Sequence, residues 1–204
     1  MRKHRPAVLS LVAACLLGAA ASHAETIRPA RSPRGKSLSP VSAKIQGKGG
    51  TLSILLETNF DIAAHLESKN AGLLAELLFD VDTSLDSGGH TLLSESWQQG
   101  GYDFLATVSA CKRSGDTAVC DGSFGAGQRI TEVYGEWVPA RWSTAKAGFA
   151  PLAGGGRRVP IAGKTIQIDI PYSELGAEAG TKVKMTIVCG FGGARFEDFA
   201  VTLE

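Results

Sequence analysis

The feature that most constrains the fold of this chain is a period-two alternation of apolar and polar residues. Between Thr165 and Ile170 an isoleucine occupies every second position, with Gln167 and Asp169 between them. Successive side chains of a strand point to opposite faces of a sheet, so this pattern predicts a strand with one buried face. Pro171 ends the strand, because proline cannot donate a hydrogen bond to a neighbouring strand.

The same alternation recurs from residue 41 onwards and is clear in 181–189. Weaker versions occupy 41–45, 51–57, 103–111, 130–137 and 196–203. Residues 73–82 are interpreted as a further strand, and residues 61–69 as one short helix that begins at a capping aspartate. Many short strands without alternating helices predict an all-β fold, an antiparallel β-sandwich of jelly-roll type.

The N-terminus has the organisation of a cleavable secretory signal peptide, residues 1–24. A basic segment, 1–5, precedes an apolar run, 7–21, that is too short to cross a bilayer, and small residues follow at Ser22 and Ala24. After cleavage, the mature chain would contain no second apolar stretch of membrane-spanning length. We therefore expect a periplasmic or secreted protein.

An alternative lies inside the same segment. The order Val12-Ala13-Ala14-Cys15 resembles a bacterial lipoprotein box, in which the cysteine becomes a lipid anchor. The residues after Cys15 continue the apolar run instead of beginning a polar tether, which favours ordinary cleavage.

The remaining chain divides into a linker and one domain. Residues 25–40 are rich in Pro, Ser, Arg and Lys and lack apolar periodicity, which predicts a disordered basic linker that could contact anionic cell-envelope polymers. Residues 41–204 suffice for a single β-sandwich domain with a sizeable core. This domain is slightly acidic, which argues against a nucleic-acid partner.

Three cysteines follow the signal peptide, and their spacing predicts one disulfide, Cys111–Cys120. If Gly115-Asp116 is a two-residue hairpin turn, the two cysteines face each other in a non-hydrogen-bonded pair, where Cα atoms are about 4.5 Å apart. A disulfide tolerates that separation, and an oxidising compartment permits it. A zinc site would need a nearby His or further Cys. Cys189 is expected to be a buried structural thiol.

Three aspartates, Asp80, Asp82 and Asp86, lie where the strand 73–82 runs into a glycine turn. Closely spaced carboxylates with hydroxyls and carbonyls suit a hard cation such as calcium. The segment is not an EF-hand, because Leu85 occupies the position that requires glycine. A loop calcium site and solvated turn aspartates are the two interpretations.

Aromatic residues gather in the middle third of the chain. The candidate ligand-binding residues are Trp97, Tyr102, Trp137 and Trp142. Exposed flat rings can stack on sugar faces, and neighbouring polar residues such as Arg141 could hydrogen-bond to hydroxyls. Core positions are the alternative for the tryptophans of a β-sandwich.

No catalytic motif is recognisable. The sequence contains no Gly-x-Ser-x-Gly elbow, His-Glu-x-x-His helix or phosphate-binding glycine loop, and only His65 and His90 follow Ala24. We therefore expect no enzymatic activity.

Three segments taken in order, 77–82, 100–104 and 166–176, resemble family 9 carbohydrate-binding modules and their DOMON-like relatives. The similarity covers roughly residues 41–204. It implies an extracytoplasmic β-sandwich that binds sugars or, in some branches, haem.

A haem-binding branch would need axial ligands, for which Met185, His65 and His90 are the conventional candidates. The leading hypothesis is therefore a non-enzymatic secreted or periplasmic β-sandwich that binds a carbohydrate, with calcium on the 80–89 loop. The alternative is a structural or protein-interaction component of the cell envelope.

Overall fold

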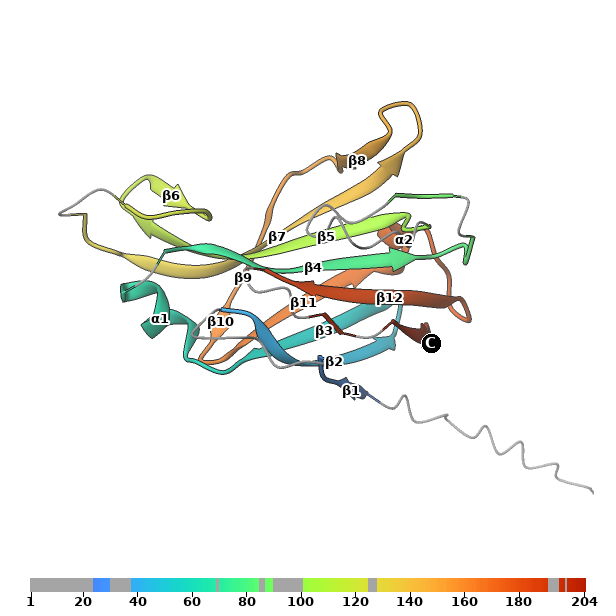
Figure 1. The fold of residues 1–204 in the computed structure, drawn as a ribbon, viewed down its shortest axis with the longest axis horizontal. Coiled ribbons are helices and arrows are strands. Elements are labelled where there is room, and N and C mark those ends of the chain that lie inside the picture. Colours follow the sequence, from blue (N-terminus) through green and yellow to red (C-terminus); the bar gives the residue numbers. More distant parts are fainter. Residues whose placement is uncertain are drawn as a thin grey trace, which may run out of the picture.

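The computed structural model describes residues 24–29, 38–68, 70–84, 87–89, 101–124, 128–190, 195–196 and 198–204. These residues form two antiparallel sheets that lie one over the other, with two short helices (Figure 1). The all-β sandwich predicted from the alternation is confirmed. No helix of these residues combines the length and the apolar character needed to cross a membrane.

The smaller sheet has five strands. In order across the sheet they are β1 (Glu25–Ile27), β2 (Pro40–Lys48), β3 (Thr51–Thr58), β11 (Thr165–Pro171) and β10 (Ile161–Ala162). Every neighbouring pair is antiparallel.

The larger sheet has eight strands. Its main path runs β13 (Phe199–Thr202), β12 (Lys182–Cys189), β4 (Gly72–Asp80), β5 (Phe104–Ser114), β7 (Glu132–Ser143) and β8 (Gly148–Pro151). Two short strands lie off this path: β6 (Thr117–Val119) pairs with β5, and β9 (Arg157–Val159) pairs with β7.

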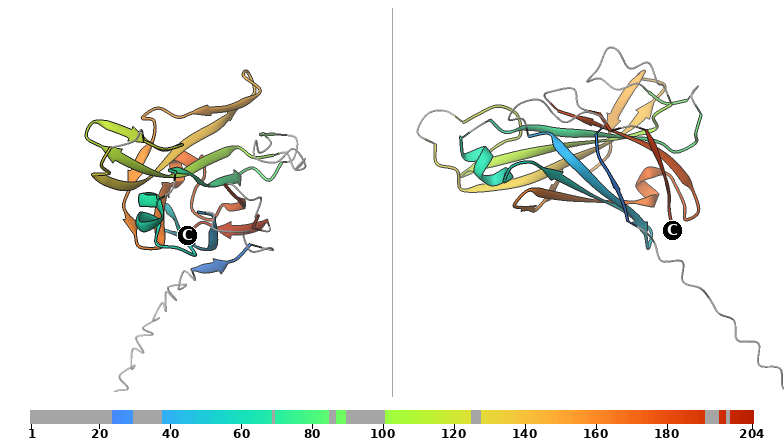
Figure 2. Two further views of the ribbon diagram at one scale, coloured as in Figure 1. Left: turned by 60° about the vertical axis from the view of Figure 1, so that its left-hand side comes forward. Right: turned by 60° about the horizontal axis from the view of Figure 1, so that its bottom comes forward.

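The helices lie at opposite ends of the sandwich, as Figure 1 shows. Helix α1 (Ile62–Ser68) connects β3 to β4, and α2 (Tyr172–Leu175) follows β11 directly. The hairpin of β7 and β8 projects away from the body of the sandwich (Figures 1 and 2). The strands β4 and β7 both end on the α2 side of the molecule (Figure 1). The candidate site is found there.

The main core fills the space between the two sheets. Ile166, Ile168 and Ile170 are each at most 1 % exposed, whereas Gln167 and Asp169 between them are exposed. Fully burying one such side chain contributes about 1.5–3 kcal/mol. The three isoleucines therefore lie on the buried face of the strand, as the period-two pattern predicted.

A second apolar cluster covers part of the outer face of the larger sheet. It comprises Leu78, Tyr102, Leu105, Ala140 and Val188, with Phe149 packed against them. Leu78 belongs to this cluster, while its neighbours Leu77 and Phe79 belong to the core between the sheets. Because β4 is buried on both faces, its sequence is a nearly continuous apolar run instead of an alternation.

The predicted disulfide is present. In the β5–β6 hairpin, Lys112 pairs with Val119 and Ser114 pairs with Thr117, which is the register that the cysteine spacing implied. Cys111 and Cys120 are bonded, with Cα atoms 4.1 Å apart. Cys189 is a buried free thiol, and burial raises its pKa to about 12.

The structure differs from the expectations at several elements. Residues 25–27, expected to begin the linker, form β1 and pair with residues 43–45 of β2. The strand expected at 130–137 continues to Ser143. The short strands β8, β9 and β10 were not predicted, since two to four residues are too few to show a period. The helix expected at 61–69 is present as α1.

Several predicted features lie outside the described residues. These are nearly all of the signal peptide with Cys15, most of the predicted linker, Asp86, His90 and Trp97.

Candidate functional site

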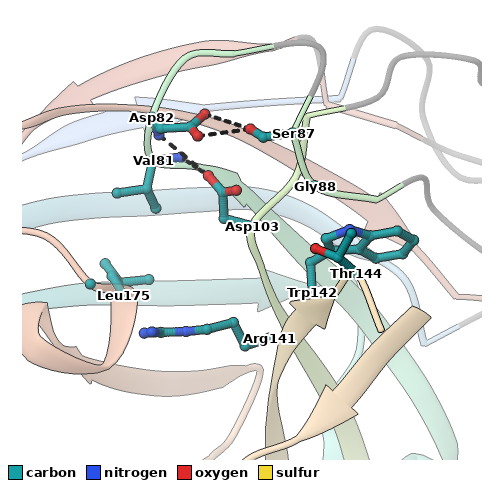
Figure 3. Close-up of a pocket in the computed structure, with 10 residues that line it drawn as sticks. Val81, Asp82, Ser87, Gly88, Asp103, Arg141, Trp142, Thr144 and Leu175 are labelled. Atoms are coloured by element: carbon teal, nitrogen blue, oxygen red, sulfur yellow. Dashed lines mark hydrogen bonds between the residues drawn. The ribbon is translucent and has the colours of Figure 1, made fainter. Parts of the chain in front are cut away.

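A pocket of about 590 Å³ opens at the α2 end of the larger sheet. Four segments of the chain line it: the residues after β4, the residue before β5, the end of β7, and the end of α2 with the glycine that follows it. Figure 3 shows Asp82, Asp103, Trp142, Arg141 and Leu175 around it. Small-molecule sites typically occupy about 300–1,000 Å³, so the pocket has the size of a ligand site.

Two carboxylates form one wall and organise the loop after β4. Asp103 Oδ2 accepts hydrogen bonds from the backbone N–H groups of Val81 at 2.8 Å and Asp82 at 3.3 Å. Asp82 Oδ1 accepts one from the backbone N–H of Ser84 at 2.8 Å, and Ser87 Oγ donates to the same carboxylate. The carboxylates thus hold the loop in place beside the pocket.

Asp80 lies behind this wall as the last residue of β4. Asp80 is 2 % exposed, and within the part of the chain that the structure describes its Oδ1 has no hydrogen-bond partner; the backbone of Thr83 is hydrogen-bonded to the same carboxylate. Burial raises the pKa of this carboxyl, and the negative charges of Asp103 and Asp82 add to the increase. A carboxylate oxygen from each of the three aspartates lies within 4.8 Å of the other two.

The aspartates brought together therefore include two of the three that the sequence suggested. Asp80 and Asp82 are in the cluster, Asp86 is outside the described residues, and Asp103 was missed. The sequence does place Asp103 directly before a strand, β5, which begins at Phe104. Because Phe104 pairs with Phe79 in β4, Asp103 lies beside the residues at which β4 ends.

Trp142 supplies an aromatic wall. Trp142 is half-buried, and its indole packs edge-on against Phe149 with ring centroids 5.5 Å apart. The backbone N–H of Trp142 donates to the carbonyl of Asp103 at 2.9 Å, which links the aromatic wall to the acidic one. Gly89 lies against the ring so closely that a Cβ there would be 2.2 Å from Cε3 of Trp142.

Arg141 supplies a positive charge on another side of the pocket. It precedes Trp142 in β7, so the two side chains leave the strand in opposite directions (Figure 3). Nη2 of Arg141 donates to the carbonyl oxygen of Glu174 in α2 at 2.6 Å. This bond holds the guanidinium between the larger sheet and the end of α2.

The other aromatic candidates occupy different positions. Trp137 is 2 % exposed and Tyr102 is 3 % exposed, so both rings belong to apolar clusters and offer no face to a ligand. Trp137 also has the guanidinium of Arg157 over its ring at 4.8 Å. Of the four aromatic residues suggested by the sequence, Trp142 is the one that the structure places on the pocket, and Trp97 lies outside the described residues.

Two of the conventional haem ligands, Met185 and His65, lie away from this pocket, and His90 lies outside the described residues. Met185 is completely buried between the sheets. His65 lies in α1, where its ring stacks on Phe60 at 5.7 Å, at the other end of the sandwich (Figure 1).

Searches against protein-family models, curated proteins and solved structures found no match to this chain.

Proposed function

We propose that this protein is a non-enzymatic, extracytoplasmic binding domain whose ligand is a carbohydrate. The observation that carries the proposal is that the half-buried Trp142 lines one pocket together with Asp82 and Asp103. The resemblance of three sequence segments to family 9 carbohydrate-binding modules points the same way.

The chemistry of a sugar ring matches this set of groups. A pyranose has an apolar face of C–H groups, which packs well on an indole, and a rim of hydroxyls, which need hydrogen-bond partners. Carboxylates accept from hydroxyls, and charge-assisted bonds of this kind are about twice as strong as neutral ones. Arg141 adds donors for hydroxyl or acidic groups of a longer ligand that reaches round the end of β7.

Two features support a site of action outside the cytoplasm. The N-terminal segment has the order of a signal peptide. The Cys111–Cys120 disulfide suits an oxidising compartment, because cytoplasmic thiols are kept reduced. Lipidation at Cys15 is the alternative to signal cleavage, and it would hold the domain at a membrane.

The positions of two reactive side chains among the described residues, Cys189 and His65, support a binding role over an enzymatic one. Cys189 is buried and its pKa is raised to about 12, so its thiol is protonated at neutral pH and cannot act as a nucleophile. His65 stacks on Phe60 at the far end of the sandwich, where it cannot serve as a base at the pocket.

Calorimetric titration of the protein, produced from its full sequence, with a panel of neutral and acidic oligosaccharides tests the proposal. We expect saturable binding of at least one of them, which Trp142→Ala abolishes. Phe60→Ala removes another half-buried aromatic residue at the opposite end and is expected to leave binding unchanged.

Absence of binding to every oligosaccharide by a folded protein would reject the carbohydrate ligand. That outcome would favour the alternative, a structural or protein-interaction component of the cell envelope. The projecting β7–β8 hairpin offers such a partner the edge strand β8, whose first three residues are half-buried (Figure 1).

A further inference from the structure

We infer that Asp80, Asp82 and Asp103 together bind one calcium ion at the point where β4 ends and β5 begins. The calcium site shares Asp82 and Asp103 with the proposed carbohydrate site, but it is argued from the aspartates alone and does not depend on a sugar ligand. It also differs from the site suggested by the sequence, since Asp103 from the neighbouring strand takes part.

The spacing of the three carboxylates fits a single ion. Calcium binds oxygen atoms at about 2.3–2.6 Å, so two oxygens on the same ion are at most about 5 Å apart. One oxygen from each aspartate lies within 4.8 Å of the others. The three groups can therefore reach one ion with only small side-chain adjustments.

The buried carboxylate of Asp80 is the second observation that points to a cation. Asp80 is 2 % exposed, and its Oδ1 has no hydrogen-bond partner among the described residues, although the backbone of Thr83 is hydrogen-bonded to the same carboxylate. Buried polar oxygens nearly always have a partner, and a buried charge is unfavourable unless its hydrogen-bonding capacity is satisfied. A cation held among the three carboxylates would supply that partner and offset their mutual repulsion.

The lysine beside Asp80 is engaged elsewhere. Lys184 of β12 is the strand partner of Asp80, yet its Nζ lies 3.5 Å from Oδ2 of Asp198. Asp198 is in turn bonded to Arg195 and to the hydroxyl of Thr186. These cations and donors bind Asp198, and the charge of Lys184 also acts on Asp80, where it opposes the rise in pKa.

The donor set favours calcium over other common ions. All three ligands are carboxylates, which suit hard cations and not zinc. The ligands come from a strand end, a loop and the residue before another strand, an irregular arrangement that calcium accommodates better than magnesium does. Hydrogen bonds from Val81, Ser84 and Ser87 already orient Asp103 and Asp82. Water molecules would complete the coordination of the ion.

Titration calorimetry with calcium chloride alone tests the site, using the protein produced from its full sequence and treated with a chelator. We expect one saturable site per chain and a melting temperature that rises with the logarithm of the calcium concentration. Asp80→Asn and Asp103→Asn should each weaken binding by at least about tenfold, because calcium affinity depends on the number of charged ligands. Magnesium chloride should bind more weakly.

Asp116→Asn is the matched control, because it removes the same charge at the exposed turn of the β5–β6 hairpin. It should leave calcium affinity unchanged. Asp80→Asn should melt no lower than the parent protein in the presence of chelator, since it removes a buried charge that lies beside two other carboxylates and has one oxygen without a hydrogen-bond partner among the described residues. Its loss of calcium response then cannot come from misfolding.

The site is rejected if the parent protein shows no calcium binding, or if the Asp80 and Asp103 variants bind calcium as the parent does. Because these titrations contain no sugar, the two proposals fail separately. Calcium binding without any oligosaccharide binding would leave this site standing and reject the proposed function. Oligosaccharide binding without calcium binding would support the proposed function and reject the calcium site.

Discussion

Oδ2 of Asp103 accepts the backbone N–H of Val81 at 2.8 Å, a bond between the residue that precedes β5 and the residue that follows β4. The two residues are 22 positions apart in the sequence. They meet because Phe104 and Phe79 are paired neighbours in the larger sheet. This contact closes the end of the sheet beside the pocket.

Asp103→Ala should therefore destabilise the protein even without metal. It removes the acceptor of two backbone N–H groups, and we expect a loss of about 1–3 kcal/mol in the free energy of unfolding. Urea unfolding in the presence of chelator measures this loss. Asp103→Asn retains an oxygen acceptor and should lose less; an equal loss in both variants would contradict the role of these bonds.

Gly89→Ala should displace the indole of Trp142. The new methyl group would lie 2.2 Å from Cε3 of the ring, so the ring must move. We expect a cost of about 1–3 kcal/mol, together with a change in tryptophan fluorescence and weaker ligand binding. Gly148→Ala is the control, because its Cβ would meet only an ordinary contact at 3.8 Å. The fluorescence change should disappear in a Trp142→Phe background, and its persistence there would count against this explanation.

Loss of the disulfide should reduce stability without altering the pocket. Cys111 and Cys120 close a short loop in the β5–β6 hairpin, at the other end of the sandwich from Trp142 (Figure 1). We expect the double alanine variant to lose about 2–3 kcal/mol in the free energy of unfolding. Reductant should destabilise the parent by a similar amount and the variant hardly at all. A reductant effect of the same size in both proteins would show that the cross-link is not its cause.

Asp198 should make stability depend on pH in the acid range. Burial raises the pKa of this carboxyl, but the hydrogen bond from Thr186 and the charges of Arg195 and Lys184 outweigh burial and lower the pKa below 3.8. A group with a lowered folded pKa contributes stability above its unfolded pKa and loses that contribution as the pH falls through the folded value.

Asp198→Asn should therefore cost about 1–3 kcal/mol near neutral pH, where the bonds to a charged acceptor are lost. The difference between variant and parent should shrink as the pH is lowered below 3.8. Urea unfolding at neutral and acid pH measures the difference, with the exposed Asp116→Asn as control. A gap that stays constant down to the lowest pH would refute the assignment.

Strand pairing over short distances was predictable from the sequence because it depends on local geometry. The alternation at 165–170 predicted both β11 and its buried isoleucines. The turn at Gly115-Asp116 predicted the register that brings Cys111 to Cys120, since a two-residue loop leaves one way for the flanking residues to pair.

The candidate site was only partly predictable. Asp80, Asp82 and Trp142 were suggested by their types and spacing, but Trp137 was grouped with Trp142 although it lies in the core. The two tryptophans are five positions apart in one strand, so they point to opposite faces. Residue type alone does not say which face of the larger sheet stays open.

The sequence by itself determined the sandwich, the hairpin and its disulfide, because period-two patterning and turn length act between residues close along the chain. Tertiary structure alone decided that Asp103 joins Asp80 and that Trp142 remains accessible at the pocket. The first follows from the pairing of β4 with β5, and the second from the packing of Gly89 and Phe149 around the indole. Such contacts join segments far apart in the chain, and their geometry exists only once both sheets have formed.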